Sequence, residues 1–178
     1  LSCPLWSPDG KRIAFSTKTN NASGIPLYSV QVIDTETKKT DPLLNENSFI
    51  RLIGWSQSGN ELILVSAKDS TIGLPPEVSM LNLKIVTREM RQITMLKDTY
   101  LYNIHLSPDK KTLAFVSRRE TKDNVWVMSA MGGEARKITN NNDSRLYFSS
   151  LAWSPDNRSI FFGKQLRFSL LSMLTNFQ

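Results

Sequence analysis

Residues 5–16, LWSPDGKRIAFS, contain the motif that decides the fold, because variants of this stretch return three times along the chain. The three later copies begin at Gly54, His105 and Ala152. Their equivalent positions 6, 55, 106 and 153, here called the anchor positions, are separated by 49, 51 and 47 residues. A period of roughly 20 to 50 residues is typical of a solenoid, a propeller or an array.

The content of one period predicts a β-hairpin at each anchor. Ser-Pro-Asp-Gly at 7–10 suits a type I turn, in which Pro presets φ, Asp bonds the turn backbone and Gly closes the turn. The apolar runs beside the turns, such as 12–16 and 112–117, are short and rich in β-branched and aromatic residues. These features favour strands over helices.

Two further strands are expected in each period. Tyr28, Val30 and Val32 alternate with polar residues, which is the period of a half-buried strand. Equivalent third strands are predicted at 28–33, 78–83, 125–128 and 170–174, and fourth strands at 41–44, 90–94 and 135–139. The best helix candidate, 86–95, lies where a fourth strand belongs.

Four antiparallel strands in every period of about 49 residues describe the blades of an all-β protein, a β-propeller. The predicted blades are 1–47, 48–97, 98–143 and an incomplete three-stranded blade at 144–178, all in one domain. An open propeller leaves strand edges that pair with other chains. We therefore expect further blades upstream of Leu1, with the last blade borrowing its fourth strand from them; a four-bladed ring or a two-chain assembly is the alternative.

Composition excludes several classes of protein. Hydrophobic residues make up 40% and charged residues 21% of the 178 residues, close to globular averages. Cys3 is the only cysteine, so there is no internal disulfide and no cysteine-rich zinc site. No apolar run approaches the roughly 18 residues of a membrane helix, and residues 1–10 lack the charged start and apolar run expected of a signal peptide.

Catalytic chemistry is mostly missing from the sequence. His105 is the only histidine and is expected to be structural or to line the central channel, since no partner base or nucleophile is evident. Asp9, Asp109 and Asp156 occupy equivalent turns and are expected to bond the turn backbone. The oxygen-rich run 140–144 is expected to be a loop, because the spacing of a calcium loop is missing. We predict no cofactor, no metal and no enzyme activity.

Aromatic and basic residues suggest packing and binding roles. Three anchor positions hold tryptophan, which predicts packing between adjacent blades: Trp6, Trp55 and Trp153. Wide connections at 18–26 and 69–76, with a shorter one at 118–123, join the second and third strands. Such insertions often mark a binding face. From this face we select Arg118, Arg119 and Lys122 as charge available to an acidic partner.

The repeat resembles that of the TolB-type, WD-like β-propellers. Residues 6–15, WSPDGKRIAF, and the later segments VWVM (125–128) and GGEARKIT (132–139) carry the likeness over nearly the whole chain. Gln57 and Ser58 depart from it in the second unit, Leu106 in the third, and Lys110 and Asn157 replace the turn glycine. The resemblance implies a propeller of a periplasmic partner protein, of a peptidase, or of a bacterial sensor or regulator. The chain ending, 169–178, resembles the natural C-terminus of the last group.

Two classes of function follow. The first is a non-catalytic module for protein or ligand interaction, the sensory or scaffold C-terminal part of a larger bacterial protein. For this protein the resemblance favours the periplasm or cell envelope, with the cytoplasm as the alternative. The second is an accessory propeller of a prolyl oligopeptidase or dipeptidyl peptidase, whose hydrolase domain would lie outside this chain. The net charge of +6 is scattered in pairs rather than clustered, so no nucleic acid is expected as a partner.

Overall fold

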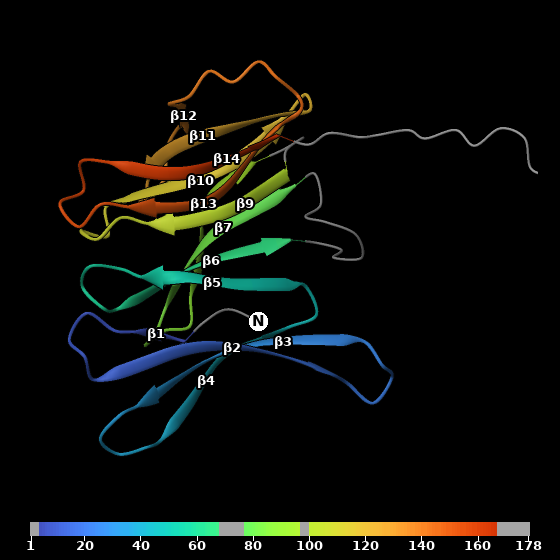
Figure 1. The fold of residues 1–178 in the computed structure, drawn as a ribbon. Coiled ribbons are helices and arrows are strands. Elements are labelled where there is room, and N and C mark those ends of the chain that lie inside the picture. Colours follow the sequence, from blue (N-terminus) through green and yellow to red (C-terminus); the bar gives the residue numbers. More distant parts are fainter. Residues whose placement is uncertain (1–3, 68–76, 97–99, 167–178) are drawn as a thin grey trace, which may run out of the picture.

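The computed structural model describes residues 4–67, 77–96 and 100–166, and these form four antiparallel sheets that follow one another in sequence order (Figure 1). The first sheet holds β1 (Leu5–Trp6), β2 (Arg12–Asn20), β3 (Pro26–Asp34) and β4 (Thr40–Glu46). The second holds β5 (Phe49–Trp55), β6 (Glu61–Ala67), β7 (Val78–Lys84) and β8 (Met90–Leu96). The third holds β9 (Tyr100–Leu106), β10 (Thr112–Arg119), β11 (Lys122–Ser129) and β12 (Arg136–Lys137). The fourth holds β13 (Leu146–Trp153) and β14 (Ile160–Leu166).

Each sheet is one blade of a propeller, with its strands paired in chain order. The inner strand of each blade contacts the inner strand of the next, from β1 to β5, β9 and β13. The described blades form an open arc rather than a closed ring, which confirms the predicted partial propeller (Figure 1). The third strand expected at 170–174 lies outside the described residues.

Two of the predicted elements differ from the observed structure, one in kind and one in length. The helix candidate at 86–95 is a turn followed by β8, and no described residue is helical. The described part of the chain thus contains no helix that could cross a membrane. The fourth strand expected at 135–139 shortens to Arg136–Lys137. The Ile138 amide still donates to the carbonyl oxygen of Val125 on β11, and the chain then crosses to the next blade.

The core fills the spaces between blades, because the middle strands are buried on both faces. In β6, Leu62 and Leu64 pack toward the first blade, whereas Ile63 and Val65 pack toward the third. Side chains alternate between the two faces of a strand, so a continuous apolar run serves two neighbouring blades at once. This explains why ELILVSA (61–67) shows no polar alternation.

Anchor residues join each blade to the one before it. Trp55 is 2% exposed, and its Nε1 donates to the carbonyl oxygen of Leu5 at 2.9 Å. Trp153 Nε1 donates in the same way to the carbonyl oxygen of His105 at 3.3 Å. These contacts agree with the predicted packing between blades. Trp6 differs, since it is 61% exposed and no described blade precedes it.

Repeated turns close the end of the propeller where the first and second strands meet. Ser7 Oγ donates to Asp9 Oδ1 at 2.5 Å, and the Lys11 amide donates to the same oxygen at 3.0 Å. Equivalent bonds hold Asp109 and Asp156, so the aspartates bond their own turns as predicted. We call this end, which also carries the hairpins between third and fourth strands, the turn end, and the opposite end the loop end.

Candidate binding site

The loop end carries the connections that the sequence marks as a binding face. The predicted wide loop at 18–26 shortens to residues 21–25, because β2 and β3 extend to Asn20 and Pro26. The connection at 118–123 tightens to a two-residue turn at Glu120 and Thr121, which have φ of 47° and 66°. The loop expected at 69–76 lies outside the described residues. The long described connection at this end is instead 138–145, between β12 and β13.

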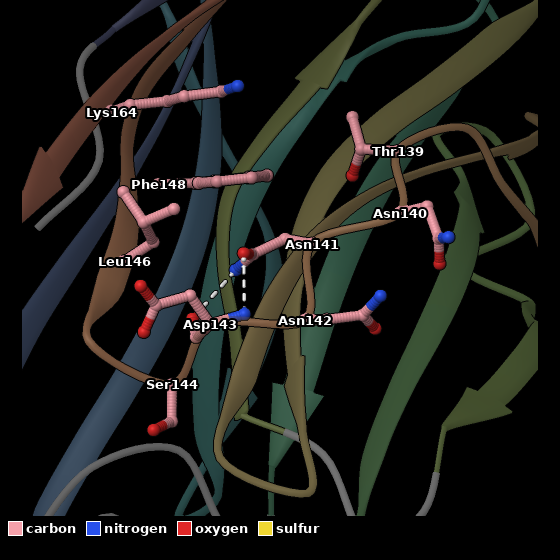
Figure 2. A pocket seen from close by; sticks show the side chains of 9 residues that line it. All are labelled: Thr139, Asn140, Asn141, Asn142, Asp143, Ser144, Leu146, Phe148 and Lys164. Carbon is pink, nitrogen blue, oxygen red and sulfur yellow. Dashed lines mark hydrogen bonds between the residues drawn. The ribbon is translucent and has the colours of Figure 1, made fainter.

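A polar pocket of about 610 Å³ opens beside this connection, between the third and fourth blades. Figure 2 shows the asparagine-rich segment on one side and Phe148 and Lys164 on the other. The lining residues are Thr139, Asn140, Asn141, Asn142, Asp143, Ser144, Leu146, Phe148 and Lys164.

Side-chain hydrogen bonds fix the connection to β11. Thr139 Oγ1 accepts from the amide of Val125 and donates to Asn124 Oδ1, both at 2.9 Å. The amide of Asn141 donates to the same Asn124 oxygen at 2.8 Å. These side-chain bonds take the place of backbone hydrogen bonds between strands, so the segment after β12 stays attached to β11. The run 140–144 is therefore a loop, as the sequence predicts, and hydrogen bonds hold it in place.

Asn141 and Asp143 shape the floor of the pocket. Asn141 Oδ1 accepts from the Asp143 amide at 3.0 Å, and its Nδ2 donates to the Asp143 carbonyl oxygen at 3.1 Å (Figure 2). The Asp143 carboxylate turns outward to Arg145, 2.9 Å away. The hydrogen bonds from Arg145 lower the pKa of Asp143, so this group is a carboxylate at neutral pH.

The other wall offers a cation over an aromatic surface. Lys164 Nζ lies 5.9 Å from the ring centre of Phe148 and 5.7 Å from that of Phe162. Phe148 is 3% exposed, which makes it a fixed wall rather than a mobile one. The side chains of Asn142 and Ser144 make no hydrogen bond within the part of the chain that the structure describes. The pocket thus presents an ammonium, an amide and a hydroxyl to solvent.

A buried carboxylate behind the pocket joins the two blades. Asp123 is fully buried; it pairs with Arg118 at 3.0 Å and accepts from the Phe148 amide at 2.9 Å and from the Tyr102 hydroxyl. Burial, followed by the hydrogen bond to Asp123, raises the pKa of Tyr102, which remains a phenol. Arg118 also lies over the Tyr147 ring at 4.3 Å. The sequence offers no periodic signal for this network.

The three basic residues selected from the sequence do not share one surface. Consecutive strand residues point to opposite faces. Arg118 points toward the fourth blade with Asp123, whereas Arg119 and Lys122 lie on the face toward the second blade. Arg119 stacks on Trp126 at 4.2 Å. The prediction that these residues bind an acidic partner stays a prediction, but Arg118 already serves an internal ion pair.

His105 lies on β9, one of the inner strands, and is partly exposed. Partial burial, together with the positive charge of Arg51 on the neighbouring inner strand, lowers its pKa. Within the described ranges, no group of three or more His, Cys, Asp or Glu side chains is placed to hold a metal ion.

Comparisons with known proteins relate the chain to propellers in different settings. No family profile matches the chain. A 55-residue segment is 49% identical to a Bacillus subtilis protein named "Uncharacterized peptidase YuxL", covering 30% of this chain and 8% of that protein. TolB from Acinetobacter baumannii superposes with a TM-score of 0.63 at 20% identity, over 88% of this chain and 36% of TolB. The β-propeller domain of the Trilobed protease from Pyrococcus furiosus gives 0.60 at 15%, over 97% and 57%.

The chain has a β-propeller fold. It spans about a third of TolB and a small part of the peptidase that it matches. At identities of 20% and below, the structural likeness establishes the fold and not the function. The choice between an interaction module and a peptidase propeller therefore depends on the chemistry of the sites.

Sequence reasoning missed three of the residues that line the pocket, Leu146, Phe148 and Lys164. All three lie on the fourth blade, and the pocket needs β13 and β14 to meet the connection from the third blade. The asparagine run at 140–142 is the one local signal that could have drawn attention to this place.

Proposed function

We propose that this chain is a non-catalytic β-propeller module that binds a protein or peptide partner at the polar pocket of its loop end. It serves as the sensory or scaffold part of a larger bacterial protein, in the cell envelope. The partner presents backbone amides and a carboxylate, which are complementary to the groups that line the pocket.

The observation that carries this proposal is the combination of rigid walls with unengaged polar groups. Phe148 is buried and Asn141 is held by five hydrogen bonds, so the pocket is formed before a ligand arrives. Asn142, Ser144 and Lys164 project from this fixed frame with their polar atoms exposed. Few placed polar groups on a pre-formed concave surface are typical of a binding site. An acyl-transfer site would need a nucleophile and a base within hydrogen-bond reach.

The test is selection of peptides from a random phage-displayed library on the immobilised protein, followed by fluorescence anisotropy with the selected peptides. Replacing Lys164 or Asn142 by alanine is expected to weaken binding about 2- to 12-fold each, the effect of one hydrogen bond or exposed charge. The matched control is Lys39→Ala, an exposed lysine on the β3–β4 hairpin at the turn end. Equal loss in all three variants, or no selected peptide, would contradict the proposal.

A peptidase propeller is the second candidate, and the 49% identity to part of the Bacillus subtilis protein named as a peptidase favours it. In that case the propeller filters access to a hydrolase domain elsewhere in the same protein. The protein that carries this chain in the cell would then react with a fluorophosphonate probe, which labels activated serines. Labelling would support this second candidate, and no labelling would leave the interaction module as the better account.

A further inference from the structure

A second hollow lies at the turn end, between the second and third blades. It is a cavity of about 410 Å³, lined by Glu61, Ile63 and Asn82 of the second blade and by Lys110 and Met131 of the third. A wider hollow of about 820 Å³ lies next to it and shares four of its lining residues. The two hollows form one continuous surface, which we call the inter-blade groove.

Asn82 places an unpaired acceptor in this groove. The residue is 2% exposed, and its Nδ2 donates to Glu61 Oε2 at 3.2 Å. Its Oδ1 is buried and accepts no hydrogen bond from the described residues. Buried polar atoms in folded proteins nearly always have a partner. The site therefore suits a ligand that supplies an N–H or O–H donor.

The neighbouring carboxylate of Glu61 accepts the hydrogen bond from Asn82 Nδ2, is partly exposed, and can accept further hydrogen bonds. Lys84 lies opposite Glu61 on β7, but among the described residues its ion pair is with Glu89 rather than with Glu61. Lys84 Nζ and Glu89 Oε2 are 2.9 Å apart. Because a carboxylate only accepts hydrogen bonds, Glu61 and Asn82 Oδ1 together form an acceptor pair for a donor group.

Apolar side chains surround this acceptor pair. Ile63 and Ala130 are 2% and 3% exposed and form the inner walls. Met131 and Val86 are 65% and 87% exposed and flank the outer part of the groove. Exposed apolar residues gathered beside a cavity mark an interaction site more often than isolated ones do. An apolar side chain of a ligand would bury this surface.

Positive charge borders the groove on the third blade. Lys110 and Lys111 line the cavity and form no ion pair among the described residues. The facing turn of the second blade holds Ser58 where the other three units hold aspartate. Ser56 Oγ and Ser58 Oγ lie 3.2 Å apart, so serine replaces the carboxylate in the turn. The turn of the second blade thus lacks the carboxylate that its equivalents carry, so Glu61 is the acidic residue among those that line the groove.

We propose that the inter-blade groove binds an extended peptide segment in which an apolar residue is adjacent to aspartate or glutamate. The backbone N–H donates to Asn82 Oδ1 and Glu61, and the apolar side chain packs against Ile63, Ala130 and Met131. The acidic side chain pairs with Lys110 and Lys111. A phosphate backbone would fit less well, because it offers no hydrogen-bond donor to the acceptor pair.

The test uses a fluorescein-labelled peptide, Gly-Ser-Leu-Asp-Leu-Asp-Ser-Gly, and a matched peptide with lysine in place of aspartate. Fluorescence anisotropy is expected to show binding of the acidic peptide and at least about tenfold weaker binding of the lysine peptide. Asn82→Leu keeps the size of the side chain and removes the acceptor, and should raise the Kd about tenfold, the loss of one buried hydrogen bond. No binding of the acidic peptide up to about 1 mM would overturn the proposal.

Further variants keep the test decisive. The double variant Lys110→Glu, Lys111→Glu changes only surface charge and is expected to weaken binding of the acidic peptide, even if Asn82→Leu fails to fold. Lys39→Glu, which reverses a charge elsewhere at the turn end, should leave the Kd unchanged. A loss of binding with Lys164→Ala instead would place the peptide at the loop end and overturn this proposal while supporting the proposed function.

Discussion

Replacing Asp123 by alanine tests whether the third and fourth blades are joined through a buried charge. The carboxylate is fully buried and contacts Arg118, whose side chain is 18% exposed, at 3.0 Å. It also accepts from the buried amide of Phe148 at 2.9 Å and from the hydroxyl of Tyr102. Alanine would leave a guanidinium, an amide and a phenol without their acceptor.

The size of the effect follows from these contacts. Removing one partner of a buried ion pair typically costs about 3–5 kcal/mol. Because Arg118 retains some access to water, we expect about 3–4 kcal/mol, a large part of the roughly 5–15 kcal/mol that stabilises a domain. For a chain of this size, each kcal/mol lowers the melting temperature by about 2–4 °C, so the expected fall is about 6–16 °C.

The assay is thermal unfolding followed by circular dichroism, with Asp41→Ala as the matched control. Asp41 also joins two blades, since Arg88 binds it at 2.7 Å, but the two side chains are 52% and 38% exposed. Exposed pairs contribute about 0–1 kcal/mol, so the control should lose no more than about 4 °C. If Asp123→Ala melts within about 2 °C of Asp41→Ala, the idea of a buried charge that joins the blades is refuted.

Three other predictions concern single residues. Gly10→Ala should destabilise the protein by about 1 kcal/mol, measured by urea unfolding. Gly10 has a φ of 70°, and no atom lies within 4 Å of an added Cβ, so backbone strain is the source of the loss. In the same assay, Trp55→Ala should lower the free energy of unfolding by about 3–5 kcal/mol and Trp6→Ala by less than about 1 kcal/mol. The reason is that Trp55 is 2% exposed and Trp6 is 61% exposed. Nuclear magnetic resonance should show the single histidine, His105, titrating below its ordinary pKa, and Arg51→Gln should raise that value. Because the folded pKa is the lower one, the neutral ring's contribution to stability should decline as the pH falls below about 6.5.

The fold could be predicted because the repeat encodes it at several levels at once. The anchor positions fix the period, the turn residues fix one end of each hairpin, and the middle strands carry apolar runs that two blades share. Trp55 and Trp153 take the predicted place between blades. Trp6 has the same sequence signal without the same burial, because burial depends on a neighbouring blade and not on the local motif.

The candidate sites were harder to predict because they form between blades. Arg118, Arg119 and Lys122 are close in sequence, but strand alternation divides them between two faces. Lys164 and Thr139 are distant in sequence and line one pocket. A period of about 49 residues identifies the equivalent positions of the units, but it does not indicate which side chains from adjacent units meet across a groove.

One departure from the repeat, Ser58, lies beside the inter-blade groove. Three units keep the Ser-x-Asp turn, in which the serine hydroxyl donates to the aspartate of the same turn. The second unit replaces that aspartate with Ser58, at the mouth of the inter-blade groove. Restoring it with Ser58→Asp should strengthen the turn, because Asp would accept from Ser56 as its equivalents do. If the groove binds an acidic peptide, the same change should weaken that binding. If Ser58 has no role in binding, the Kd for the acidic peptide should not change.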